Sequence, residues 1–406
     1  MRRTYYKLVM QLKSPLSLGS GISDNTDSDV LLDSRGNPFI PATSLAGGIR
    51  HSLDAETAGK LFGDIKNDGH ASSIIVYDAV YIEQKEREIS VRDSVKLLDK
   101  VAEDMGKFDF EVVETGAKFV GYIELVDCDE NDDDTILEAI EKINLGLLRF
   151  GHKTSRGYGI VEVVQCQKQV FKEIDKWLAF DLFDGDHWND AEEITLRSDL
   201  GITKIVLSLK QRGAVSIRSY ATTPSGKNDA APDYVQLSLQ DGTPVIPGTS
   251  WAGAFRERFS EFTDEETCRE LFGYIEKNKK DAIKKKSAIY FSESMILNAK
   301  RKIITRNSID RYTCGTNDGA LYTEETVYHG NTELNILITK GQNREVYSAL
   351  MAVIADLDNG LLAVGGLSSI GRGLFTVESL MVNGMDKTEA FKNYDFAGIA
   401  EGIANV

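Results

Sequence analysis

A fourteen-residue segment occurs twice in this chain of 406 residues, as "IPATSLAGGIRHSL" (40–53) and as "IPGTSWAGAFRERF" (246–259). Further pairs recur in the same order: "LFGD" (61–64) with "LFGY" (271–274), "SVRDSVKLLDK" (90–100) with "ITRNSIDRYTC" (304–314), "EVVETGAKF" (111–119) with "ETVYHGNTE" (325–333), and "GHKTSRGYG" (151–159) with "GGLSSIGRG" (365–373). The offset between copies grows from 206 to 210 to 214 residues, as two short loop insertions would produce. An ordered series of this kind indicates a tandem duplication of a whole domain.

Length and composition agree with two domains. A chain of 406 residues with 42% hydrophobic residues can form two domains, each with its own core. It has no apolar run of about 18 residues, and its opening "MRRTYYKLVMQLK" alternates like a strand, unlike a signal peptide. We therefore expect a cytoplasmic protein with no membrane partner. The four cysteines are scattered without a CxxC pair, which indicates neither a disulfide framework nor a zinc site.

Each half shows the same order of predicted elements: a strand, a helix, strands, a variable insert, a strand, a second helix and a last strand. Amphipathic helices are predicted over 133–148 and 344–362, the first of them capped by Asp132 to Asp134. Alternation predicts the strands, which are 5–12, 72–82, 117–126 and 158–164 in the first half and 203–209, 287–297, 332–338 and 373–379 in the second. This βαββαβ-like order predicts an α+β protein with two tandem ferredoxin-like (RRM-like) domains.

The boundaries of these domains follow from the repeat and from a change in composition. We expect a first domain over 1–170, an acidic and aromatic linker that packs at least in part over 171–201, a second domain over 202–382, and a peripheral C-terminal tail over 383–406.

The repeated segment has the pattern of a helix that begins directly after an extended residue pair. Pro41 and Pro247 each follow an isoleucine, and each precedes a Thr-Ser pair that can cap a helix. Small residues in the first turn allow close approach, and free N–H groups at a helix N-terminus favour an anion such as a phosphate. The alternative for either copy is a capped helix that packs tightly on a sheet.

The ordered set "IPxTSxxGxxR", then "LFG", an arginine-containing segment, and a terminal glycine-rich loop resembles the RAMP superfamily of CRISPR-associated proteins. The similarity covers about residues 5–165 and 203–380. It is strongest to the backbone subunit of type III effector complexes, here with two fused domains as in the III-D and III-E branches. "TDSDVLLDSRGNPFIPATSLAG" resembles the catalytic-loop stretch of that subunit, and "TRNSIDRYTCGTNDGALYTEE" resembles its thumb-bearing stretch.

The resemblance implies a subunit that binds the CRISPR guide RNA, target RNA and other CRISPR effector subunits, with an inserted thumb hairpin in each domain. Helix N-termini and glycine loops bind phosphates without reading bases, as a carrier of many guides requires. The positions that match the RNA-binding pattern are Thr43, Ser44, Arg50, Lys153, Ser155 and Arg156 in the first domain and Thr249, Ser250, Arg256, Ser368, Ser369 and Arg372 in the second. The second glycine loop departs from the pattern, because Ile370 stands where the first has Arg156.

Target cleavage in this family depends on an aspartate in the loop before the first helix. Asp27 and Asp233 each lie fourteen residues before the proline of the repeated segment, so both copies keep this position. The resemblance therefore implies catalytic and metal-binding roles for Asp27 and Asp233, with Mg²⁺ or another divalent cation as cofactor. A carboxylate there could help activate a ribose 2′-OH beside an unstacked phosphate. The alternative is that these are ordinary acidic residues of solvated loops.

The net charge runs against the expectation for an RNA-binding protein. The formal charge is −16 at pH 7, whereas RNA-binding domains are usually basic. Acidic residues concentrate in 126–134 and in the linker, and basic residues concentrate in 277–311. "AKRKIITRNSIDR" (299–311), with Arg306 and Arg311, flanks the predicted second thumb and is the better candidate for RNA contact. "KNKKDAIKKK" (277–286) is equally well explained as a solvated insertion.

Three functions remain open at this point. The chain is a two-domain backbone subunit that cuts target RNA at Asp27 and Asp233, the same scaffold without catalysis, or a stand-alone processing ribonuclease that uses a histidine as general acid or base. Tandem thumbs and loop aspartates at matching positions favour the first function, whereas a solitary histidine site would favour the third. His51, His70 and His152 lie in the first domain without counterparts in the second.

Overall fold

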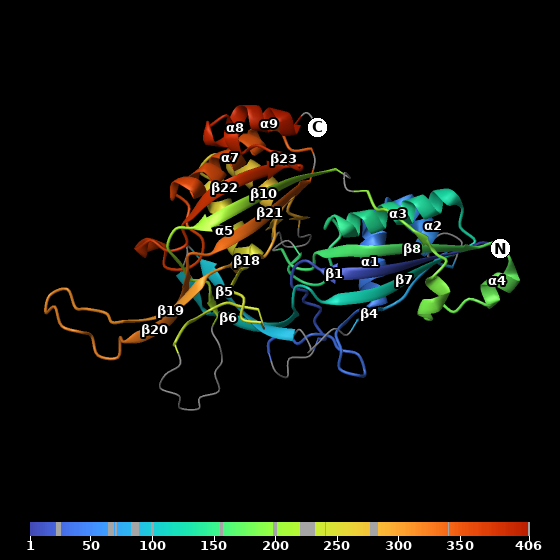
Figure 1. Ribbon diagram of the computed structural model, residues 1–406, viewed down its shortest axis with the longest axis horizontal. Helices are drawn as coiled ribbons and strands as arrows, with labels where there is room; N and C mark the ends of the chain where they lie inside the picture. The colour runs from blue at the N-terminus through green and yellow to red at the C-terminus, as the bar shows by residue number, and fades with distance from the viewer. Residues whose placement is uncertain are drawn as a thin grey trace. The chain divides into compact units, whose positions relative to one another are not determined.

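The computed structural model contains two compact units, which are described separately (Figure 1). The first comprises residues 1–154 and 158–200, and the second comprises residues 155–157 and 201–406. The structure describes residues 1–21, 26–63, 69, 71–82, 89–98, 101–154, 157–197, 201–219, 232–239, 241–276, 283–339 and 341–404. None of the helices in these ranges is both long and apolar enough to cross a membrane.

The first unit is built on an antiparallel sheet in the order β2-β4-β7-β1-β8-β9, with β3 also paired to β7. Its elements are β1 Arg3–Leu12, β2 Phe39–Ile40, α1 Ala42–Ser52, α2 Ala55–Phe62, β3 Ile74–Val76, β4 Ala79–Tyr81, β5 Ile89–Leu98, β6 Val101–Val113, β7 Lys118–Val126, α3 Glu130–Asn144, β8 Val161–Phe171, α4 Ile174–Leu178, the 3₁₀ helix η2 Gly185–Trp188 and β9 Glu192–Glu193. β5 and β6 pair with each other as a separate hairpin.

The second unit repeats this sheet in the order β14-β18-β21-β10-β22-β23, with β17 also paired to β21. Its elements are β10 Ile202–Gln211, β11 Ala214–Val215, β12 Arg218–Ser219, β13 Val235–Gln236, β14 Val245–Ile246, α5 Gly248–Phe259, α6 Glu265–Phe272, β15 Tyr274–Glu276, β16 Ile283–Lys285, β17 Ile289–Phe291, β18 Ser294–Leu297, β19 Lys300–Arg306, β20 Tyr322–Tyr328, β21 Asn331–Thr339, α7 Arg344–Asn359, the 3₁₀ helix η3 Ser368–Ile370, β22 Phe375–Val382, β23 Met385–Asp386, α8 Thr388–Lys392 and α9 Phe396–Ala404. β19 and β20 form a hairpin, and β20 also pairs with β11 to give a separate three-stranded sheet.

The central strand of each sheet shows why its sequence alternates. Tyr6, Leu8, Met10 and Leu12 of β1 are buried in one core with residues of both α1 and α3, so the two helices cover the same face. β10 is buried in the same way with α5 and α7, and Trp251 of α5 is fully buried there. The neighbouring strands β8 and β22 each carry an extra residue opposite the central strand, Val164 facing Val9 and Met10, and Glu378 facing Ser208 and Leu209. The mixed α+β content agrees with the fold class predicted from the sequence.

The acidic linker contains a strap, residues 174–191, that covers the other face of the first sheet. Trp188 is 1% exposed and packs with Tyr5 and Tyr122, and the indole Nε1 of Trp177 donates a hydrogen bond of 2.7 Å to the hydroxyl of Tyr5. The aromatic residues of this segment are therefore part of a second, smaller core of the first unit.

The C-terminal segment is not peripheral, contrary to our expectation. Phe391, Ile399, Ala400 and Ile403 of α8 and α9 are buried in the core of the second unit, and α9 packs on α7 (Figure 1). Ile399, Ala400 and Ile403 form one apolar face of α9, and this face packs on α7.

Two further details differ from the sequence-based prediction. The strands predicted over 72–82 and 287–297 are each split, the first into β3 and β4 around Tyr77 and Asp78 and the second into β17 and β18 around Ser292 and Glu293. The cap of α3 is Asp129, whose carboxylate accepts a hydrogen bond of 3.0 Å from the backbone N–H of Asp132, while Asp132 accepts one of 3.1 Å in return. This is a capping box with the cap three residues earlier than we predicted.

The short helices α2 and α6 were not predicted, although each carries terminal signals. Asp54 and Asp264 accept hydrogen bonds from the backbone N–H of Thr57 (2.9 Å) and Thr267 (2.7 Å), as N-caps do. Each helix ends at the glycine of the "LFG" motif, with φ +80° at Gly63 and +77° at Gly273. The repeated motif is therefore the C-terminus of a capped helix.

We expect the cap at Asp264 to make the stability of the second unit depend on acidic pH. The hydrogen bonds from the backbone and hydroxyl of Thr267 lower the pKa of Asp264 below its ordinary value of 3.8. Because the pKa is lower in the folded state, the stabilisation is present above the pKa of the unfolded chain and is lost as the pH falls through the folded pKa. Asp264→Asn keeps the hydrogen-bond acceptor without titrating.

Urea unfolding between about pH 5 and about pH 2 measures this effect. The free energy of unfolding should fall less steeply with decreasing pH in Asp264→Asn than in the wild type, whereas Glu266→Gln in the same turn should behave as the wild type. Equal slopes for wild type and Asp264→Asn would show that the cap has no such role.

Candidate nucleic-acid interface

The two loop aspartates make the same contact in both units. The carboxylate of Asp27 accepts a hydrogen bond of 3.0 Å from the backbone N–H of Asp109 in β6. The carboxylate of Asp233 accepts one of 2.6 Å from the backbone N–H of Thr323. Thr323 lies in β20, the second strand of the second hairpin, and both aspartates are exposed to solvent. Each loop aspartate therefore lies at the surface against the second strand of its hairpin.

The backbone next to each aspartate docks on the hairpin in the same register. The N–H of Glu111 donates to the carbonyl of Ser28 at 3.0 Å, and the N–H of Glu325 donates to the carbonyl of Tyr234 at 2.8 Å. These residues are related by the offsets of 206 and 214 found in the sequence. The repeated geometry shows that the loop and the hairpin form one structural feature in each unit.

The Thr-Ser pairs do not cap their helices. Pro41 and Pro247 are the residues before α1 and α5, with no side-chain capping bond. Thr43 is exposed, and Ser44, Thr249 and Ser250 are half-buried within the first turn. At α1 the N–H of Ala42 donates to the carboxylate of Asp78 at 2.6 Å, so an acidic side chain takes the first donor that we assigned to a phosphate.

The helix arginines are available at the surface, but at the other end of their helices. Arg50 and Arg256 are exposed and lie in the last turn of α1 and α5. Each is favourably placed for the helix dipole there. Their exposure is compatible with RNA contact, which stays a prediction, and they lie at the opposite end of each helix from the first turn.

Each glycine-rich loop closes on itself through a backbone hydrogen bond. The N–H of Phe150 donates to the carbonyl of Gly159 at 3.1 Å, and the N–H of Val364 donates to that of Gly373 at 2.9 Å. Gly159 and Gly373 have φ of +71° and +75°, and a Cβ at either position would collide with the carbonyl oxygen of Phe150 or Val364. The loop therefore requires glycine for both its torsion angle and its space.

The predicted RNA-binding side chains of the glycine loops have different placements. Ser155 and Arg156 lie outside the described residues. Lys153 is half-buried, with its Nζ over the rings of Phe108 and Phe110. Ser368 and Ser369 are exposed in η3.

Arg372 is buried, whereas direct contact with RNA requires an exposed side chain. Its side chain is 3% exposed, and its guanidinium makes a bidentate ion pair with Glu324 of β20, with Nη1 2.6 Å from Oε2. A buried arginine that is paired in this way has a structural role, and its charge is largely neutralised by its partner and not available to RNA.

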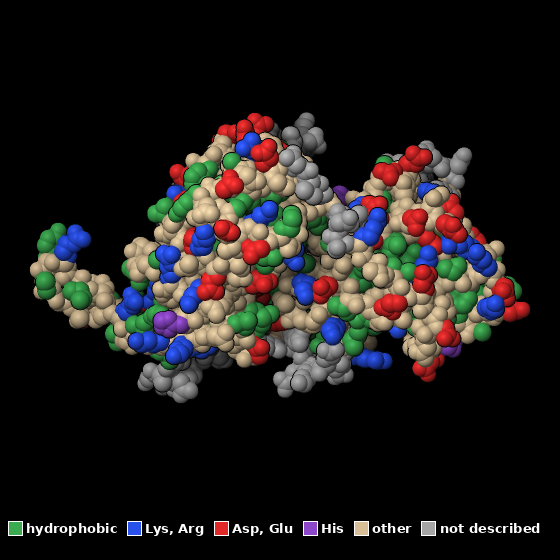
Figure 2. Space-filling model, turned by 45° about the horizontal axis from the view of Figure 1, so that its top comes forward, with side chains coloured by type: hydrophobic (Ala, Val, Ile, Leu, Met, Phe, Trp, Pro, Cys, Tyr) green, Lys and Arg blue, Asp and Glu red, His purple; other side chains and the backbone are tan. Residues whose placement is uncertain are grey.

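The second hairpin carries the remaining two predicted residues. Nε of Arg306 in β19 lies 3.2 Å from Oε1 of Glu324, and its side chain is 36% exposed. Arg311 is exposed in the segment between β19 and β20, next to Tyr312, which is 92% exposed. The hairpin therefore ends in an open surface with apolar and basic side chains, which Figure 2 shows at the tip of the protruding arm.

The charge on the surface is mixed and not uniformly acidic. Figure 2 shows acidic and basic side chains interspersed over one face, with basic side chains gathered at the base of the arm formed by β19 and β20. Lys300, Arg301 and Lys302 of β19 are all exposed. This local positive charge is compatible with an RNA-binding surface on a protein whose net charge is −16. Most of "KNKKDAIKKK" lies outside the described residues.

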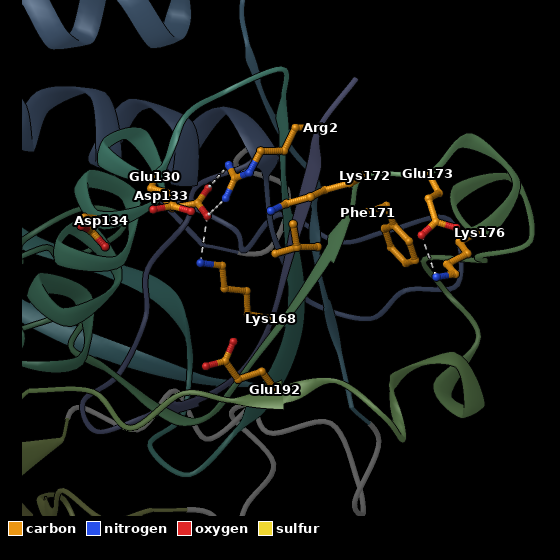
Figure 3. Close-up of a pocket in the computed structure, with 11 residues that line it drawn as sticks. Arg2, Glu130, Asp133, Asp134, Lys168, Phe171, Lys172, Glu173, Lys176 and Glu192 are labelled. Carbon is orange, nitrogen blue, oxygen red and sulfur yellow. Dashed lines mark hydrogen bonds and ion pairs between the residues drawn. The ribbon is translucent and has the colours of Figure 1, made fainter.

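A polar pocket of the first unit is a weaker candidate for an RNA site (Figure 3). Asp133 of α3 pairs there with both Arg2 and Lys168, at 2.6 and 2.8 Å, and Lys176 pairs with Glu173 at 2.9 Å. Three of the four cationic groups thus have carboxylate partners within the pocket, whose lining carries five carboxylates. It offers no surplus of positive charge to a phosphate.

The described residues contain no group of three or more histidine, cysteine, aspartate or glutamate side chains arranged to hold a metal ion. Asp27 has the carboxylate of Asp109 beside it, and Asp233 has the hydroxyl of Thr323. Mg²⁺ is commonly bound by one or two carboxylates together with water and substrate phosphates. An exposed aspartate fits that mode as a single ligand, and the metal-binding role remains a prediction.

Four buried or half-buried residues of this region were missed by the sequence analysis: Asp109, Phe110, Tyr158 and Glu324. Phe110 and Glu324 occupy equivalent positions of β6 and β20, each directly after the residue that contacts the loop aspartate. Glu324 could have been noticed in the sequence, because it lies on the buried face of a strand with alternating side chains. A charged residue in such a position usually has a partner of opposite charge.

Taken together, the fold and this region define a protein with two copies of one α+β unit, each with a loop aspartate, a hairpin and a glycine loop in contact. The family model of the RAMP superfamily matches residues 9–162 and 210–376, once in each unit. The chain belongs to the RAMP superfamily, whose members are CRISPR-associated proteins that bind RNA and other Cas subunits. Comparison with curated proteins gives no match.

Proposed function

We propose that the chain is a CRISPR RNA-binding backbone subunit of a type III interference complex that also cleaves target RNA. In this proposal each unit is a ferredoxin-like domain, and the hairpins β5–β6 and β19–β20 are its thumbs. The order β1-α1-β4-β7-α3-β8 in the chain and β4-β7-β1-β8 in the sheet supports the ferredoxin-like assignment. The proposal extends the family assignment to a partner, a substrate and a reaction.

The observation that carries the proposal is the repeated docking of an exposed aspartate on a hairpin strand. A thumb that enters a guide–target duplex would unstack a nucleotide beside the hairpin strand that contacts Asp27 or Asp233. An unstacked nucleotide can place its 2′-OH in line with the adjacent phosphate, which a stacked one cannot. The aspartate would accept the proton of that hydroxyl as general base, and the 2′-oxygen would form a bond to phosphorus. The bond from phosphorus to the 5′-oxygen of the next nucleotide would break, and that oxygen would take a proton from water. When bound, Mg²⁺ or another divalent cation would supply stabilisation of the charge that develops on the phosphate.

The guide RNA would be held by groups that recognise phosphate and not base. Exposed Arg50 and Arg256, Ser368 and Ser369 beside the second glycine loop, and Arg311 on the thumb are the described side chains available for this contact. Ser155 and Arg156 remain predicted contacts. Arg372 is not among these groups, because its guanidinium is buried and paired with Glu324.

The test is cleavage of a labelled, guide-complementary RNA by the assembled complex with magnesium. Asp27→Asn and Asp233→Asn keep an oxygen that can accept the hairpin N–H but remove the general base, so each should abolish one set of products with target binding unchanged. The expected loss in rate at that site is at least about 100-fold. Asp33→Asn, in a turn of the same loop, should cut as the wild type does.

Two outcomes would favour the alternatives. If all products persist in the Asp27→Asn/Asp233→Asn double variant, the chain is a scaffold at these positions. If the purified chain cleaves a hairpin precursor of CRISPR RNA by itself, it is a processing ribonuclease and both scaffold proposals are wrong.

A further inference from the structure

Each hairpin contacts the glycine loop of its own unit through a side-chain pair at equivalent positions. In the first unit the ring of Tyr158 lies 6.0 Å from the ring of Phe110, centroid to centroid. In the second unit Arg372 and Glu324 form the bidentate ion pair described above. Both members of the second pair lie 214 residues after those of the first, the offset that relates the hairpins and the glycine loops.

All four side chains are buried. The exposed fractions are 6% for Tyr158, 2% for Phe110, 3% for Arg372 and 0% for Glu324. An aromatic pair in one copy and an ion pair in the other thus occupy the same place between the same two segments. The two copies differ in the chemistry of this contact, but both retain the contact itself.

The same strand also holds the loop aspartate. Asp109 and Thr323, which contact Asp27 and Asp233, directly precede Phe110 and Glu324. The loop aspartate contacts both the backbone N–H and the side chain of that preceding residue, so one strand contacts the loop aspartate and the glycine loop at adjacent residues. A shift of this strand would change the spacing between the two.

We propose that Phe110–Tyr158 and Glu324–Arg372 are positioning pairs that fix the hairpin strand between the glycine loop and the loop aspartate. This inference rests on the proposed function, in which the glycine loop holds guide phosphates and the aspartate acts on the target strand. The pairs would then set the distance between the glycine loop that binds the guide phosphates and the aspartate that cleaves the target. A displacement of about 1 Å can reduce a rate by about 100-fold.

Hydrogen exchange of the full chain without RNA tests the positioning itself. Glu324→Gln and Arg372→Gln break the ion pair, and Glu324→Phe with Arg372→Tyr transplants the pair of the first unit. Glu325→Gln is the matched control, because Glu325 is the next residue and pairs with Arg301 within the same hairpin. We expect faster exchange in β19 and β20 for both single variants, and recovery toward the wild-type rate for the transplant. Wild-type exchange in both single variants would overturn the proposal.

Cleavage by the assembled complex tests the consequence for function. Each single variant should lower the rate at the site of Asp233 by up to about 100-fold, with guide affinity and cleavage at the site of Asp27 unchanged. The transplanted pair should restore the lost cleavage. If guide affinity and both cleavage sites fall together, the pair is merely structural and the inference is wrong. If the wild-type complex cuts no target, the proposed function fails, and the exchange experiment alone decides whether the pairs position the hairpin.

Discussion

Replacing Gly373 by alanine is expected to lower the free energy of unfolding of the second unit by about 3 to 5 kcal/mol. Gly373 has φ +75°, which a residue with a side chain adopts only with strain, and the new Cβ would collide with the carbonyl oxygen of Val364. That oxygen belongs to backbone, so the collision cannot be relieved by rotating a side chain. The N–H of Gly373 also donates to the carbonyl of Ala214 at 2.9 Å, which a shift of the loop would break.

Urea unfolding measures this loss, with Gly253→Ala as the matched control. Gly253 lies within α5 of the same unit, and a Cβ there would meet no atom within 4 Å. Alanine in a helix is about 1 kcal/mol more favourable than glycine, so Gly253→Ala should be neutral or slightly stabilising. A Gly373→Ala variant as stable as Gly253→Ala would show that the loop can rearrange at little cost. Gly159→Ala should have the corresponding effect in the first unit.

The second large effect is expected at the buried ion pair of the first hairpin. Arg92 of β5 is 2% exposed, and one of its guanidinium nitrogens lies 2.7 Å from Oε2 of Glu114. The hydroxyl of Ser90 also donates to Glu114. Glu114→Ala leaves a buried guanidinium without its carboxylate, which typically costs about 3 to 5 kcal/mol.

A surface ion pair of the same unit provides the control. Lys13 and Glu162 lie 2.9 Å apart, but their side chains are 51% and 41% exposed. Glu162→Ala should therefore cost less than about 1 kcal/mol. The double variant Arg92→Met/Glu114→Leu should recover part of the stability lost in Glu114→Ala, because it removes both charges of the buried pair. Similar urea midpoints for Glu114→Ala and Glu162→Ala would contradict the structural role of the buried pair.

The sequence was sufficient to predict the duplication, the α+β class and the positions of the two amphipathic helices. These features are local, since an apolar period or a repeated segment is visible without knowing what packs against it. At the start of α1 the helix signals failed because two rules compete. Pro41 was expected to precede a Thr-Ser cap, but α1 begins directly after Pro41, and Thr43 and Ser44 lie inside the helix.

The contacts between segments could not be predicted in the same way. Arg372 was assigned to RNA because it lies near the position of Arg156, whereas the structure places it at the position of Tyr158 and against Glu324. Glu324 is 48 residues away in the chain, and its counterpart in the first unit is a phenylalanine. Comparing the two copies therefore hides the pair, since the residue types differ at both positions.

The three tryptophans of the chain are divided between the units, and this gives each unit its own fluorescence signal. Trp177 and Trp188 belong to the strap on the first sheet, and Trp251 lies in the core of the second unit. Trp188 and Trp251 are 1% and 0% exposed, so their emission should shift to longer wavelength as each unit opens to water. In a Trp251→Phe variant all of the indole emission would come from the first unit, and the unfolding of the two units would be spectroscopically separable.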